Sequence, residues 1–128
     1  MHLDRKNRLA AAIVAMLIGP MGQALANTSN AEICAAATSQ EKAIQSKLQT
    51  PGPCRHDSEC AAVSLGCPFP CAAVVAASER AEFDRSVERL RKSQAEGDCG
   101  TCVYRCGFAE FQRQPKCVAA RCTLEPAK

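Results

Sequence analysis

The sequence predicts a small α+β domain that is rich in disulfide bonds, with two helices over about residues 30–49 and 78–95 and with short antiparallel strands. Three observations support this prediction. The chain has ten cysteines, and all of them follow an apolar N-terminal segment. Two segments show the 3.6-residue apolar period of amphipathic helices. The remaining apolar runs are short and are separated by turn residues.

Residues 1–26 have the organisation of a cleavable signal peptide. Basic residues precede an unbroken apolar run over 9–18, and small residues follow at 24–26. An apolar helix of this length rises about 15 Å, roughly half the thickness of a bilayer core, so it is short for a membrane anchor. We therefore expect cleavage after Ala26 and a secreted or periplasmic protein with no further membrane segment.

The charge of the remaining chain narrows the classes of partner. Residues 27–128 contain 13 Lys and Arg against 12 Asp and Glu, a net charge of +1. A near-neutral domain lacks the electrostatic attraction that nucleic acids and anionic membranes require. We expect a monomer whose partner is a protein.

The cysteine content predicts how the domain is stabilised. Thiols exported to an oxidising compartment pair into disulfides, and an even count leaves none over. The chain has no Trp, one Tyr and four Phe, so its apolar core is thin. We expect structural disulfides throughout, with a pairing that the sequence leaves open, at Cys34, Cys54, Cys60, Cys67, Cys71, Cys99, Cys102, Cys106, Cys117 and Cys122.

The first helix is expected in an N-terminal part, residues 27–53, that ends in a proline-rich linker. Ser29 and Glu32 have the spacing of a capping box, and a Pro-Gly-Pro sequence terminates the helix. The apolar stripe of this helix is thin. A helix held to the domain through Cys34 and a loosely attached arm therefore both remain open.

The second part, residues 54–128, is expected to form the disulfide-rich domain. Its apolar pattern begins with a short strand, and a hairpin with its turn near 119–121 closes the chain. Gly97 is the expected C-cap of the second helix. The buried stripe of that helix is expected at Phe83, Val87 and Leu90.

Four cysteine motifs follow one another in this part: Cys-x-x-Asp-x-x-Cys at 54–60, a cysteine-rich turn at 67–71, Cys-x-x-Cys at 99–102 and Cys-x-x-x-x-Cys at 117–122. This order resembles that of small exported cysteine-rich bacterial proteins, over about residues 54–124. The resemblance implies an exported domain and no particular activity.

Cys99-Gly100-Thr101-Cys102 is the one motif with an enzymatic interpretation. In thioredoxin-like proteins, a Cys-x-x-Cys motif at a helix N-terminus has a lowered thiol pKa. Here the residues that follow have an extended pattern, and eight other cysteines surround the motif. Structural disulfides are therefore favoured, and a thiol–disulfide redox pair at Cys99 and Cys102 is the alternative.

A metal site is the second alternative. Cys99, Cys102 and Cys106, together with Cys67 and Cys71, have spacings found among metal ligands. Zinc, iron–sulfur and cuprous sites all need thiolates, which oxidation removes. Copper is the metal best suited to an exported site of this kind, but we expect no cofactor.

Cys67-Pro68-Phe69-Pro70-Cys71 is the candidate binding loop. Its cysteines and prolines restrict the conformations of Phe69, which lowers the entropy cost of binding. Disulfide-rich protease inhibitors present rigid loops in this way. An inward ring would instead add volume to a core that is poor in aromatic residues. Both positions remain open.

No hydrolytic site is expected. His56 is the only histidine after residue 26, and no nucleophile motif accompanies it. Asp57 and Glu59 suit turn or capping roles. The sequence thus predicts an exported, non-catalytic binding or inhibitory module.

Overall fold

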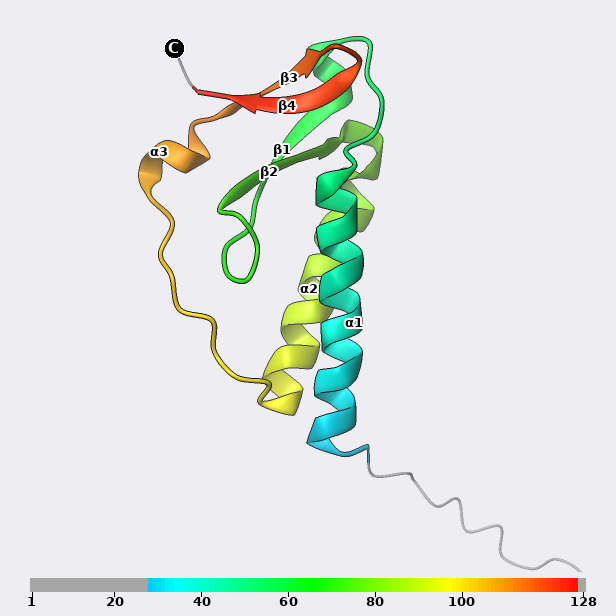
Figure 1. Ribbon diagram of the computed structural model, residues 1–128, viewed down its shortest axis with the longest axis vertical. Coiled ribbons are helices and arrows are strands. Elements are labelled where there is room, and N and C mark those ends of the chain that lie inside the picture. Colours follow the sequence, from blue (N-terminus) through cyan, green and yellow to red (C-terminus); the bar gives the residue numbers. More distant parts are fainter. Residues whose placement is uncertain (1–27, 127–128) are drawn as a thin grey trace, which may run out of the picture.

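The computed structural model describes residues 28–126, so the predicted signal peptide lies outside the described residues. Helices and two antiparallel strand pairs confirm the α+β class (Figure 1). Within residues 28–126, no helix is both long and apolar enough to cross a membrane. In chain order the elements are α1 Asn30–Gln49, β1 Cys60–Ser64, β2 Ala72–Ala76, α2 Arg80–Gly97, α3 Phe108–Phe111, β3 Gln114–Val118 and β4 Arg121–Glu125.

Helix α1 begins as its sequence predicts. The Ser29 side chain accepts the Glu32 backbone N–H, and the Glu32 carboxylate accepts the Ser29 N–H at 2.8 Å, which completes a capping box. Ala37 and Ile44, seven residues apart, are buried on one face. This face packs on α2, which lies beside α1 in Figure 1.

Helix α2 buries the stripe that its period predicts. Phe83, Val87 and Leu90 are 5 % exposed or less, and they form the main core with residues of α1 and of the first strand pair. The prediction of Gly97 as the C-cap is wrong. Asp98 is the cap, with φ 49°, and Gly97 is the last, buried residue of the helix.

The strands form two separate hairpins. In the first, β1 pairs with β2 so that Val63 lies opposite Ala73. In the second, β3 pairs with β4 around a two-residue turn in which Ala119 and Ala120 have φ 50° and 60°. This geometry is that of the tight hairpin turns whose twist matches the strands. The predicted closing hairpin is therefore confirmed.

The two hairpins pack against each other at one end of the helix pair (Figure 1). Between them lies a second, smaller core of Cys54, Cys60, Val74 and Cys122. From the far end of α2, residues 98–107 return to α3 without helix or strand, as an elongated trace in Figure 1. This connection runs past the loop that joins β1 to β2.

Candidate functional site

All ten cysteines are bonded, as their even count predicts, and residues 28–126 contain no free thiol. Disulfide bonding at this density is typical of an oxidising compartment. The Cα atoms of the bonded residues are 5.3 to 5.8 Å apart, within the usual range. The five bonds are Cys34–Cys99, Cys54–Cys117, Cys60–Cys122, Cys67–Cys102 and Cys71–Cys106.

This pairing does not contain the Cys99–Cys102 bond that the redox alternative needs. Cys99 bonds to Cys34 and thereby joins the end of α2 to the start of α1. Cys102 bonds instead to Cys67. A Cys-x-x-Cys redox pair requires a bond between its own two cysteines, so the motif serves here as two unrelated structural anchors.

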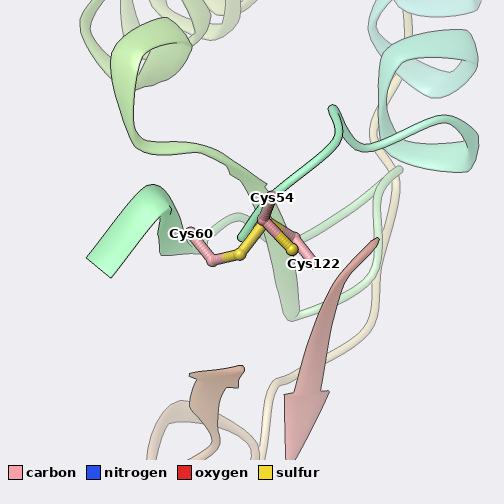
Figure 2. Close-up of side chains that lie close together, drawn as sticks. All are labelled: Cys54, Cys60 and Cys122. Atoms are coloured by element: carbon pink, nitrogen blue, oxygen red, sulfur yellow. A yellow bond between two sulfur atoms is a disulfide. The ribbon is translucent and has the colours of Figure 1, made fainter. Parts of the chain in front are cut away.

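Three buried sulfurs lie within 4.8 Å of one another, those of Cys54, Cys60 and Cys122 (Figure 2). Cys60 is bonded to Cys122, and Cys54 is bonded to Cys117. Cysteine binds a metal through its thiolate, and the sulfurs of a disulfide are not thiolates. The cluster therefore acts as the apolar core between the hairpins. The cysteines of the alternative metal site are likewise all in disulfides.

The loop from Leu65 to Cys71 directs Phe69 inward, which corrects the binding-loop alternative. Gly66, with φ 120°, turns the chain, and the Phe69 N–H donates to its carbonyl oxygen at 2.9 Å. Phe69 is only 3 % exposed and belongs to the main core. Because much of the apolar content of this chain is small and aliphatic, the Phe69 ring supplies volume to that core. Of its two neighbours, Pro68 is half-buried and Pro70 is exposed.

The acidic residues Asp57 and Glu59 of the 54–60 loop accept hydrogen bonds from backbone N–H groups. Asp57 accepts the backbone N–H of Cys117 at 2.8 Å and the Lys116 ammonium at 2.9 Å. These two bonds, the first above all, lower the pKa of Asp57. Glu59 accepts the backbone N–H groups of Arg55 and His56, which lowers its pKa. Both carboxylates are thus engaged in structure.

The same two disulfides that fix the Phe69 loop also fix an exposed segment, Cys102–Cys106. Cys67 bonds to Cys102 and Cys71 bonds to Cys106. The first cysteines of the two Cys-x-x-x-Cys motifs are thus bonded to each other, and so are their last cysteines. Because both anchors lie in a loop packed on the core, each end of the segment is held in place. We call residues 102–106 the clamped segment.

The clamped segment presents apolar side chains to solvent. Val103 is 88 % exposed and Tyr104 is 45 % exposed, and two further aromatic residues, Phe108 and Phe111 of α3, are 77 % and 44 % exposed. Three of the five aromatic residues in the chain therefore lie outside the core, close together in sequence. These exposed apolar side chains make residues 103–111 the candidate binding surface among the described residues.

The side chains of the clamped segment differ in what they contact. Cys102 and Cys106 bond to the Phe69 loop. Tyr104 and Arg105 both line a groove of about 310 Å³ beside Pro70 and Cys71. Val103 does not line this groove and is 88 % exposed.

Sequence patterns did not predict this segment as a candidate site, although the sequence carries one signal for it. The 67–71 and 102–106 motifs share the same Cys-x-x-x-Cys spacing, which allows two parallel disulfides. Comparison with known proteins finds no matching family model, no similar curated protein and no similar solved structure. The site is therefore interpreted from its geometry alone.

Proposed function

We propose that the protein is a non-catalytic binding module of the periplasm or the extracellular medium, and that the clamped segment is its protein-binding surface. The observation that carries this proposal is an exposed apolar segment whose two ends are covalently fixed to the core.

Fixed ends favour binding because less conformational freedom is lost on association. Ordering a flexible side chain at an interface costs about 0.5–1.5 kcal/mol, and flexible backbone adds to this cost. The disulfides at Cys102 and Cys106 restrict the three residues between them before any partner arrives. Apolar Val103 and Tyr104 then supply surface whose burial is favourable.

The binding surface is tested with two matched substitutions. Val103→Asp places a charge within the clamped segment, and Val118→Asp places one at an exposed position, 47 % exposed, on β3. Wild type and both variants are crosslinked in the organism's own exported fraction, and the captured proteins are identified by mass spectrometry. A partner lost with Val103→Asp and kept with Val118→Asp supports the proposal. A partner that both variants retain, or no specific partner, contradicts it.

The absence of free thiols, on which the redox alternative would depend, has its own test. The intact mass of the purified mature protein is measured before and after treatment with an alkylating agent. We expect a mass ten hydrogens below that of the reduced chain and no alkylation, since five disulfides consume every thiol. Alkylation at Cys99 and Cys102 alone would favour the redox alternative instead.

A further inference from the structure

We infer that the partner is a serine endopeptidase with a small apolar specificity pocket, and that Val103 occupies this pocket. The inference rests on the proposed function and adds the chemical class of the partner. It makes the protein an inhibitor whose clamped segment binds as a substrate does.

The first support is the backbone. Peptides that bind in extended form pair their N–H and C=O groups with an edge of the partner, and internally paired groups are not free to do so. Within residues 28–126, no backbone–backbone hydrogen bond involves residues 100–106, whereas Cys99 still donates to Gln94. The backbone N–H and C=O groups of the clamped segment, which follows an elongated path (Figure 1), are therefore free to bind in a cleft that accepts extended peptides.

The second support is the choice of side chain. Among residues 28–126, Val103 is the most exposed of the large apolar residues, whereas Cys102 is held in its disulfide and Tyr104, 45 % exposed, lines the groove beside Pro70. Serine endopeptidases differ in the pocket that receives the residue before the cleaved bond, which is acidic, a deep apolar slot, or small. A short branched aliphatic side chain fits the small pocket, as found in elastase-type enzymes.

The third support is what cleavage would achieve. Hydrolysis of the Val103–Tyr104 bond adds one water and leaves a carboxylate on Val103 and an amine on Tyr104. Three disulfides, Cys54–Cys117, Cys60–Cys122 and Cys71–Cys106, join the parts on either side of this bond. The new ends lie one and two residues from Cys102 and Cys106. They stay close together at high effective concentration, so the bond is readily re-formed and product release is slow.

The test measures inhibition constants against three purified serine endopeptidases, one of the elastase type, one of the chymotrypsin type and one of the trypsin type. We expect the oxidised protein to inhibit the elastase-type enzyme. Val103→Asp should weaken this inhibition about 30-fold or more, as for a dominant interface residue, and Val118→Asp should leave it unchanged. Val103→Arg should transfer inhibition to the trypsin-type enzyme, whose pocket is acidic.

The transfer of specificity separates a pocket residue from a merely structural one, and resistance to alkylation verifies that each variant is folded. Inhibition that survives Val103→Asp would overturn the inference, as would inhibition lost only with Tyr104→Ala. Rapid, complete hydrolysis at Val103–Tyr104 would make the protein a substrate and also overturn it. If no enzyme is inhibited but the crosslinked partner still depends on Val103, only this inference fails. If that dependence is absent too, the proposed function fails with it.

Discussion

Gly97→Ala tests whether the contact between the two helices depends on the absence of a side chain. Gly97 is buried at the end of α2, where a Cβ atom would lie 2.7 Å from Cys99 Sγ, 2.8 Å from Ile33 Cγ2 and 3.0 Å from Cys34 Sγ. The two sulfurs are bonded to each other, so neither can rotate away. Ile33 is β-branched and therefore stiff at its first torsion.

Two effects of this substitution oppose each other. Helix propensity favours alanine over glycine by up to about 1 kcal/mol, and less at a helix end. Overpacking a site that cannot relax costs about 1–3 kcal/mol. The structure therefore predicts a net destabilisation of about 1–2 kcal/mol, which lowers the melting temperature by roughly 5–15 °C for a domain of this size. Propensity alone predicts the opposite sign.

Thermal and urea unfolding of the oxidised mature protein measure the effect. Gly107→Ala is the matched control, because a Cβ there meets nothing within 4 Å and the backbone φ is −75°. We expect it to change stability by no more than about 0.5 kcal/mol. A Gly97→Ala protein as stable as wild type, or more stable, would refute the packing argument.

Two further substitutions test the core and the acidic loop. Phe69→Ala should lower the free energy of unfolding by about 3–5 kcal/mol, because it empties a core position, while Phe108→Ala, at a side chain 77 % exposed, should have little effect in the same urea titration. The backbone N–H of Cys117, followed by Lys116, lowers the pKa of Asp57, so the stabilisation from this carboxylate is present above its ordinary pKa of about 4 and is lost as the pH falls through its lowered value. Urea midpoints measured from pH 7 to pH 2 should therefore fall less steeply for Asp57→Asn than for wild type, and identical slopes would show that the bonds of Asp57 contribute nothing.

The elements that sequence patterns predicted correctly depend on local interactions. The capping box joins Ser29 and Glu32, which are three positions apart in the sequence, and needs no tertiary contact. The stripe of Phe83, Val87 and Leu90 follows from the helical period alone. The observed helix lies two residues later than its predicted range of 78–95, since a short turn at 77–79 precedes it.

Phe69, the candidate binding residue of the sequence, lies in the buried part of a linked pair of loops. Two disulfides join the 67–71 loop to the clamped segment. Phe69 of the loop is buried, whereas Val103 of the clamped segment faces solvent. Phe69 and Val103 are both apolar residues inside a Cys-x-x-x-Cys motif, so the cysteine spacing does not distinguish them. Their exposures differ because the 67–71 loop packs on the main core, whereas the clamped segment lies outside that loop.

By itself, then, the sequence determined the fold class, the bonding of its cysteines in disulfides, the two helices and the closing hairpin, because composition and short-range periodicity carry that information. Only the tertiary structure decided which cysteines pair, that Gly97 serves packing rather than capping, and that Val103 rather than Phe69 is exposed. Each of these depends on where segments meet that are 35 or more residues apart, and no local pattern records such meetings.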